Sequence, residues 1–218
     1  MARIVITSGP TRQYLDPVRY LTNGSSGRMG AALAQATLDL GHDVTIISGP
    51  VSVLYPAAAK VVDVVSTQEM LEATRSAFHT ADGLIGAAAP CDYMPRQIEK
   101  HKLTKTGEGL QLSLIETPDI IATLGTSKQA HQWVVGFALE TEDIRFRAIV
   151  KMSRKCCDMI VSNSAEAMNA DDNSVEVILR DGSILGQLTG PKSEVARGIL
   201  FHIEKHLIAK KPWIDRPL

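Results

Sequence analysis

Short, uninterrupted runs of apolar residues recur along this chain. A strand that is covered on both faces of a sheet is apolar on both sides, so its sequence is continuous rather than alternating. Such runs occur at residues 3–9, 43–49, 61–65, 83–89, 133–139 and 158–163. Apolar residues at helical spacing fill most of the intervals, at residues 27–41, 67–78, 119–125 and 142–155. Strands that alternate with helices predict an α/β fold with a doubly wound, mostly parallel sheet.

The later part of the chain follows a different pattern. Residues 174–190 contain two strands around Asp181-Gly182, which predicts a hairpin, and residues 191–210 predict a closing helix. The long irregular interval at residues 90–117 predicts a flap or projecting hairpin, because loops of this length in compact domains tend to be lids or ligand clamps. We therefore expect one domain over residues 1–218 that carries a flap or dimerisation segment at 90–117.

Composition and charge exclude several classes of function. The chain has 218 residues and is 44% hydrophobic, which suffices for one substantial core. Its formal net charge is −1, from 23 Lys and Arg against 24 Asp and Glu, so no overall field attracts nucleic acid or an anionic membrane. No apolar run reaches the roughly 18–20 residues of a membrane span, and the first residues enter a strand without a signal-peptide pattern. We expect a cytoplasmic protein with neither nucleic-acid nor membrane partners.

Three glycines, Gly24, Gly27 and Gly30, lie where a phosphate-binding turn would open the first predicted helix. An NAD(P)-binding enzyme of the Rossmann type requires such a motif directly after the first strand, and an acidic residue at the end of the second. Here the residues PTRQYLDPVRYLTN intervene, and the second strand ends in IISGPV without a carboxylate. No Tyr-x-x-x-Lys pair occurs either. An NAD(P)-dependent oxidoreductase therefore stays an alternative, as does a non-catalytic nucleotide sensor.

Polar residues gather where the predicted strands end. Ligands of open α/β sheets bind beyond the carboxyl ends of the strands, where helix N-termini point free N–H groups outward. The stretches at that edge are residues 9–23, 25–30, 87–92, 137–141 and 162–163. From residue type alone, Asn23 is either a turn residue or an amide donor, and Arg19 is either a surface side chain or a forked anion donor. The lysines at residues 100–105 are either a solvated loop or a cationic flap.

The stretch TSGPTRQYLDPVRYLTNGSSGRMG resembles, over its full length, the entry loop of the phosphopantothenoylcysteine synthetases, the ligases of coenzyme A biosynthesis, in their bacterial CTP-using form. The resemblance continues in order through GAAAPCDY, KHKLTK, TPDIIATL, VVGFALET, KMSRKCCDMIVSN and DDNSVEVILRDG. In bacteria this ligase is usually fused behind a flavin-dependent decarboxylase domain, and the chain resembles the ligase portion alone. The resemblance therefore implies a free-standing synthetase of Rossmann-like fold, with no FMN.

The resemblance implies a reaction in two steps. CTP first activates the carboxylate of 4′-phosphopantothenate as an acyl-cytidylate and releases pyrophosphate, and L-cysteine then displaces CMP. The first step brings a carboxylate next to a triphosphate, so cations and Mg²⁺ must balance the charge. The family is typically dimeric, which implies a homodimer in which residues 90–117 lie near the substrate site of the partner.

The resemblance also implies roles for individual residues. Asn23 would hold the acyl-cytidylate for attack, and Lys102 on the flap would neutralise the triphosphate. Where the family has a further lysine this chain has Leu103, and whether Lys105 compensates is open. The implied substrate-binding residues are Arg19, Ser25, Ser26, Gly27, Ala88 and Ala89. The implied nucleotide-binding residues, besides Lys102, are Asp92 (directly or through Mg²⁺), Pro118, Asp119, Ile120, Ile121, Phe137, Lys151 and Lys155, with Asn163 as a further candidate near the ribose.

Overall fold

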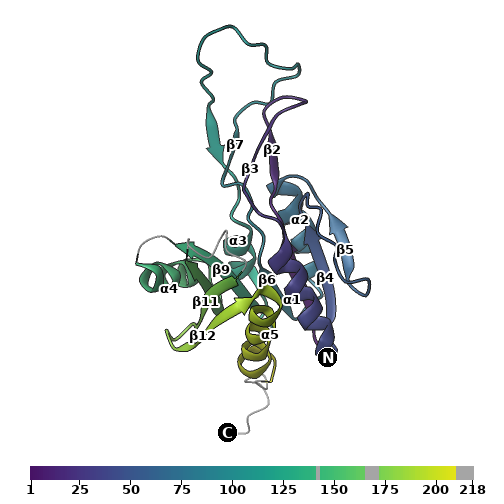
Figure 1. The fold of residues 1–218 in the computed structure, drawn as a ribbon, viewed down its shortest axis with the longest axis vertical. Helices are drawn as coiled ribbons and strands as arrows, with labels where there is room; N and C mark the ends of the chain where they lie inside the picture. The colour runs from purple at the N-terminus through teal and green to yellow at the C-terminus, as the bar shows by residue number, and fades with distance from the viewer. Residues whose placement is uncertain (141–142, 165–171, 210–218) are drawn as a thin grey trace.

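The computed structural model describes residues 1–140, 143–164 and 172–209, which form an α/β fold around one large sheet (Figure 1). The strand order is β12-β11-β10-β9-β6-β1-β4-β5. The parallel strands are β1 (Arg3–Ser8), β4 (Asp43–Ser48), β5 (Lys60–Asp63), β6 (Gly83–Gly86), β9 (Trp133–Glu140) and β10 (Met159–Ser164). β11 (Asp172–Leu179) and β12 (Ile184–Pro191) extend the sheet as an antiparallel hairpin. The predicted doubly wound, mostly parallel sheet is confirmed.

Helices cover both faces of this sheet. α1 (Arg28–Asp39) and α5 (Lys192–Ile203) pack on one face, whereas α2 (Thr67–Phe78), α3 (Ile120–Ser127) and α4 (Ile144–Arg154) pack on the other. Successive side chains of a strand point to opposite faces, so Ile4 and Ile6 of β1 join the α1 side and Val5 joins the α2 side. This burial on both faces explains the continuous apolar runs of the sequence. A π-helical turn, η2 (Glu204–Ile208), prolongs α5.

The helices that follow the carboxyl ends of the strands begin in different ways. Ser66 caps α2 by accepting the N–H of Glu69 at 3.1 Å, and Asp119 caps α3 by accepting the N–H of Ala122 at 2.9 Å. α1 instead follows Gly27, whose φ of 75° lies in the left-handed region, and the described residues give α1 no side-chain cap. The first N–H groups of α1 are therefore available to an anion.

A projecting arm rises from the carboxyl edge of the sheet, at the top of Figure 1. It contains the antiparallel hairpin of β2 (Arg12–Tyr14) and β3 (Tyr20–Thr22), and the pair of β7 (Tyr93–Pro95) and β8 (Leu114–Glu116) at the base of a long loop. β2 lies against β7, so the two parts form one arm. Residues 90–117 therefore project as predicted, whereas the hairpin of β2 and β3 was not predicted.

The strand predicted at residues 83–89 is shorter than expected and ends at Gly86. Beyond it, the N–H of Ala88 donates to Thr7 Oγ1 at 3.3 Å and the N–H of Ala89 donates to the carbonyl of Gly9 at 2.9 Å. The chain after β6 thus leaves the sheet and follows the chain after β1. The hairpin predicted around Asp181-Gly182 is confirmed, and Gly182 has a φ of 84° in its turn.

Candidate active site

The strand order reverses between β1 and β6, near the centre of the carboxyl edge. β4 and β5 lie on one side of β1, whereas β6, β9 and β10 lie on the other. The segments that follow β1 and β6 meet there through the hydrogen bond between Ala89 and Gly9. Open α/β sheets bind their ligands at such a switch point.

A cleft of about 270 Å³ opens next to this point. Its walls come from the ends of β6 and β9, from the base of the arm, from the start of α3 and from the end of α4. It brings together these sequence-predicted residues: Ala88, Asp92, Pro118, Asp119, Ile120, Ile121, Phe137 and Lys155. Sequence reasoning missed other lining residues, among them Cys91, Tyr93, Glu116, Thr117 and Arg154. Each of these residues lies next to a predicted site residue or within a predicted segment, and this proximity in the sequence could have identified it.

Asp119 links α3 to the end of α4. Its Oδ1 caps α3, and its Oδ2 lies 3.0 Å from Lys155 Nζ. The two helices approach closely, because a Cβ on Gly125 of α3 would lie 2.0 Å from the carbonyl oxygen of Lys155. The absence of a side chain at Gly125 therefore allows Lys155 to reach the N-terminus of α3. An ammonium group and the positive end of a helix dipole favour an anion at the same place.

A buried hydrogen-bond network holds the wall of the cleft at Cys91. The N–H of Cys91 donates to Thr11 Oγ1 at 2.9 Å, and its carbonyl accepts from Thr117 Oγ1 at 2.6 Å and from Thr67 Oγ1 at 3.3 Å. The N–H of Thr117 donates to the carbonyl of Asp92 at 2.9 Å. Burial raises the pKa of the Cys91 thiol, which suits a structural rather than a nucleophilic role.

Asn23 lies at the base of the β2–β3 hairpin, beside this wall. Its Nδ2 donates to the carbonyl of Pro90 at 2.8 Å and to that of Ala89 at 3.4 Å. These acceptors directly precede Cys91 and Asp92, which line the cleft. Asn23 is exposed. The structure thus brings the predicted catalytic amide next to the cleft, although Asn23 is not part of its described lining.

The glycine turn lines a separate concavity of about 630 Å³. Its walls are Arg12, Ser25, Ser26, Arg28 and residues 50–53 of the loop after β4. Sequence reasoning missed the two arginines, although Arg28 directly follows the predicted turn. The guanidinium of Arg12 also lies over the ring of Tyr20, 4.5 Å from its centroid. Two cations next to the uncapped start of α1 suit a phosphate group.

Arg19 and Lys102 lie on the arm, away from the cleft of their own chain. Arg19 is at the tip of the β2–β3 hairpin, where its Nη2 donates to the carbonyl of Leu103. The three residues of β3 separate that tip from Asn23 at the base, and the four residue steps span about 13 Å. Lys151 and Asn163 are also outside the lining of the cleft, as far as the structure describes it. Most predicted site residues therefore fall into three groups, the cleft, the glycine turn and the arm, whereas Lys151 on α4 and Asn163 on β10 belong to none of them.

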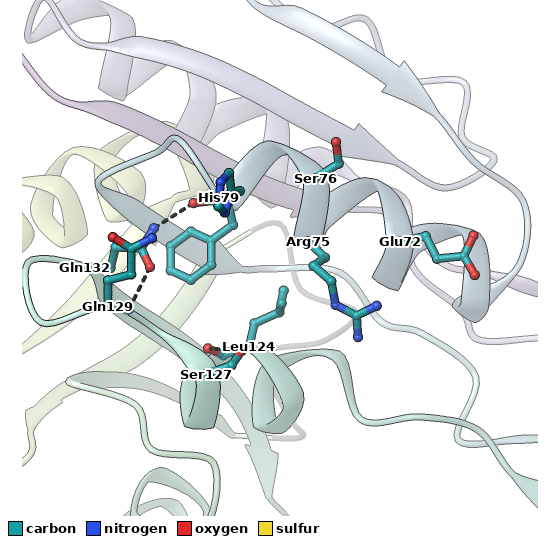
Figure 2. A pocket seen from close by; sticks show the side chains of 9 residues that line it. Glu72, Arg75, Ser76, His79, Leu124, Ser127, Gln129 and Gln132 are labelled. Atoms are coloured by element: carbon teal, nitrogen blue, oxygen red, sulfur yellow. Dashed lines mark hydrogen bonds between the residues drawn. The ribbon is translucent and has the colours of Figure 1, made fainter.

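A further groove, of about 460 Å³, lies between α2 and α3 at the opposite edge of the sheet (Figure 2). Arg75 and His79 come from the end of α2, and Gln132 directly precedes β9. The side chain of Gln132 donates to the carbonyl of Phe78 at 2.6 Å, which is a structural contact. Because α2 and α3 end here, the positive ends of their dipoles lie at the other edge. We therefore place the candidate site at the carboxyl edge.

The described residues contain no group of three or more His, Cys, Asp or Glu that could hold a metal ion. Mg²⁺ bound mainly through substrate phosphates needs only one or two protein carboxylates, so Asp92 in the cleft fits a metal that arrives with a nucleotide. Within the same described ranges, no helix has the length and apolar character needed to cross a membrane.

Residues 1–207 match the family described as the DNA/pantothenate metabolism flavoprotein C-terminal domain. The coenzyme A biosynthesis bifunctional protein CoaBC of Bacillus subtilis is 43% identical over 184 residues, which are 82% of this chain and 45% of that protein. CoaBC of Vibrio parahaemolyticus is 39% identical over 187 residues, which are 83% of this chain and 47% of that protein. The chain thus spans about half the length of these curated relatives. A crystal structure of the C-terminal domain of CoaBC shares 37% identity and a TM-score of 0.82, covering 96% of this chain and 98% of that one. The chain therefore belongs to the family of DNA/pantothenate metabolism flavoprotein C-terminal domains.

Proposed function

We propose that the chain is a phosphopantothenate-cysteine ligase, which joins 4′-phosphopantothenate to L-cysteine with CTP. The observation that carries the proposal is the cleft at the switch point, where Asp92, Lys155 and the start of α3 surround space for a triphosphate. The relatives of the chain are named for coenzyme A biosynthesis, which supports this substrate class. Mg²⁺ enters with CTP, FMN is not required, and the protein acts in the cytoplasm.

The first half-reaction takes place in the cleft. A carboxylate oxygen of the substrate attacks the α-phosphorus of CTP, an O–P bond forms, and the bond to the β-phosphate breaks as pyrophosphate leaves. Lys155 and the first N–H groups of α3 face the negative charge, so the triphosphate competes with the 3.0 Å ion pair between Lys155 and Asp119. Residues 118–121 border the cytosine, and Phe137 lies beside its ring. Asp92 would hold Mg²⁺ together with the phosphates, and the ion would supply positive charge that balances theirs.

The phosphate of the other substrate binds at the glycine turn. Ser25, Ser26 and the N–H groups after Gly27 receive it, and Arg12 and Arg28 add two positive charges. The concavity at this turn and the cleft lie on the same edge of the sheet, so one extended substrate can occupy both.

Asn23 connects these two regions and carries the second half-reaction. Its Nδ2, which donates to the carbonyl of Pro90 in this structure, turns to the acyl carbonyl of the cytidylate. That carbonyl binds beside Ala88 of the cleft lining and the neighbouring Ala89. The amine of cysteine attacks that carbonyl, a C–N bond forms, and the C–O bond to CMP breaks. The amide donor stabilises the charge that develops on the carbonyl oxygen.

Lys102 acts across a homodimer in this proposal. The arm projects from the carboxyl edge of the sheet (Figure 1), and Lys102 is not among the residues that line the cleft of its own chain, so we assign it to the cleft of a second copy. Arg19 lies on the same arm. Its Nε contacts Asp16 and its Nη2 contacts Leu103, whereas Nη1 takes part in neither contact. Lys151, one turn before Lys155 on α4, adds a further cation near the triphosphate.

The oxidoreductase alternative is not favoured. The hairpin of β2 and β3 is inserted between β1 and α1, so the glycines do not form the short strand-turn-helix loop that cradles a dinucleotide. β4 ends at Ser48 rather than at an acidic residue for a ribose.

Nucleotide selectivity tests the proposal. CTP with Mg²⁺ should raise the melting temperature more than ATP, NAD or NADP do, because a ligand that binds only the folded chain stabilises it. After addition of 4′-phosphopantothenate and cysteine, CMP and pyrophosphate should form in equal amounts. Stabilisation by NADP with no formation of CMP would contradict the ligase assignment.

A further inference from the structure

The tip of the β2–β3 hairpin contains a carboxylate that is wholly buried, although it lies on the projecting arm. The side chain of Asp16 has no exposed surface. Its Oδ1 accepts the N–H of Val18 at 2.8 Å and the N–H of Arg19 at 2.9 Å. Its Oδ2 accepts the N–H of Leu103 at 3.1 Å and lies 3.5 Å from Arg19 Nε. A buried charge is tolerated only with partners of this kind.

These partners keep Asp16 ionised. Burial alone raises the pKa of a carboxyl group, but the N–H groups of Val18, Leu103 and Arg19, together with the charge of Arg19, lower the pKa of Asp16 below its ordinary value. The carboxylate is therefore charged at neutral pH, and hydrogen bonds to a charged acceptor are stronger than those between neutral groups.

The same residues hold the long loop of the arm. Asp16 accepts the N–H of Leu103, and Arg19 Nη2 donates to the carbonyl of Leu103. The N–H of Glu99 donates to the carbonyl of Leu15 at 2.9 Å, which adds a second attachment. Leu103 is half-buried, whereas Lys102 and Lys105 are exposed. The residue that replaces a lysine of the family pattern is thus the anchor of this loop.

Anchoring Leu103 also restricts Lys102. The N–H of Leu103 belongs to the peptide group that contains the carbonyl of Lys102, and a peptide group is planar. Holding that N–H therefore fixes the carbonyl and the Cα of Lys102 while its side chain stays exposed. A lysine on an unanchored loop would lose backbone conformational entropy when it binds its ligand. An anchored lysine loses that entropy during folding, so its binding costs less free energy.

We propose that Asp16 is a positioning residue that joins Arg19 and Leu103 into a clasp and so presents Lys102 to the triphosphate in the first half-reaction. The proposal rests on the proposed ligase function. Arg19 and Lys102 are 83 positions apart in the sequence, yet Asp16 contacts Arg19 directly and holds the peptide group that follows Lys102. Asn at position 16 would retain one acceptor oxygen, but its NH₂ group cannot accept the N–H of Leu103 and would face the guanidinium of Arg19.

Two measurements on full-length Asp16→Asn test the clasp. Amide hydrogen exchange at Leu103 should become at least about tenfold faster, because its acceptor is lost. The rate constant for pyrophosphate release should fall by about tenfold or more, while the KM for cysteine stays unchanged. The matched control is Glu108→Gln, which neutralises an exposed carboxylate on the same arm and should change neither value.

A second variant distinguishes loss of the clasp from misfolding of the β2–β3 hairpin. Leu103→Pro removes the N–H that Asp16 accepts and leaves Asp16 in place. It should slow pyrophosphate release as much as Asp16→Asn, and the double variant should be no slower than either, as expected for one shared interaction.

The outcomes distinguish the clasp from the proposed function. If Asp16→Asn leaves exchange at Leu103 or pyrophosphate release unchanged while Lys102→Gln abolishes the release, the clasp is overturned and the ligase function stands. If Lys102→Gln itself releases pyrophosphate at the normal rate, the flap role of Lys102 fails, and the positioning role of Asp16 fails with it.

Discussion

At the scale of single residues, the side chains proposed to bind ligands in the candidate site also make contacts that hold the fold. Asp119 caps α3 with one oxygen and pairs with Lys155 through the other. Asn23 ties the base of the hairpin to the carbonyls of Ala89 and Pro90. A ligand that engages Lys155 or the Asn23 amide must replace contacts that the fold already makes. Binding is therefore expected to shift α3 and the hairpin base together.

Asn23→Ala should separate the two half-reactions. Pyrophosphate release should continue, whereas formation of the cysteine product should fall by about 100-fold or more, the usual effect of removing one donor to a developing oxyanion. Labelled acyl-cytidylate should accumulate on the variant and be recoverable by chromatography. Thermal unfolding of Asn23→Ala must be compared with that of the wild type, because the tie to Pro90 is also lost. Normal product formation would remove Asn23 from the mechanism.

At the scale of elements, the three glycines of the entry loop have different surroundings. Gly24 has open space around the position of a Cβ. Gly27 has a positive φ at the start of α1. Gly30 packs on β1, where a Cβ would lie 2.1 Å from Ser8 Oγ. Ser8 cannot move freely, because its Oγ donates to the carbonyl of Gly27 and accepts from the hydroxyl of Tyr55. Of the three glycines, Gly30 is therefore required for helix docking and Gly27 for the turn before α1.

Gly30→Ala should lower the free energy of unfolding by up to about 2 kcal/mol. Alanine has the higher helix propensity by about 1 kcal/mol, but overpacking at a buried contact costs about 1–3 kcal/mol and exceeds it. The matched control is Gly24→Ala, which should stay within about 0.5 kcal/mol of the wild type. Urea denaturation followed by circular dichroism measures both. A Gly30→Ala protein at least as stable as the wild type would show that α1 docks more loosely than the structure indicates.

The success of element prediction depended on burial. β1, β4, β9 and β10 were predicted within two residues at each end, because strands covered on both faces have a distinct composition. β2 and β3 were missed because each has only three residues, and the one buried residue, Gln13, is polar, so neither strand shows an apolar periodicity. The end of β6 was misplaced because Ala87 to Ala89 are as apolar as a strand, although their N–H groups bond outside it.

At the scale of the whole molecule, the arm exposes apolar side chains that the chain itself does not cover. Ile98 is 59% exposed and Leu110 is 60% exposed, and Leu112 and Leu114 are also exposed. An arm this thin has no core of its own, and exposed apolar surface on a projecting element is typical of an interface. The proposed homodimer would cover these residues and bring Lys102 to the cleft of the partner.

Leu110→Glu combined with Leu112→Glu should shift the protein from dimer to monomer, because burying two carboxylates in an apolar interface is unfavourable. Light scattering coupled to size-exclusion chromatography measures the mass, and pyrophosphate release should fall in parallel. Phe146→Glu is the control, since Phe146 on α4 is 70% exposed and lies outside the arm. A double variant that remains dimeric and active would exclude these leucines from the interface.

The candidate site could be predicted in part. Residues that follow buried strands, such as Asp92, or that begin a helix, such as Asp119, converge on the cleft as expected. The arm residues Arg19 and Lys102 could not be located, because the contacts that hold them join segments far apart in the sequence. A local sequence pattern does not predict contacts between residues so far apart in the sequence.

The sequence by itself determined the class of the fold and the places of the buried strands along the chain, and it predicted a ligand site at the carboxyl edge of the sheet. Strands buried on both faces and the starts of helices each have a recognisable local composition. Only the tertiary structure decided that Asp16 is buried, that Leu103 is an anchor and that the glycine turn and the proposed nucleotide cleft are separate hollows. Those features depend on contacts between residues that are far apart in the sequence. The free energy of such a contact depends on both partners, so no single stretch of sequence reports it.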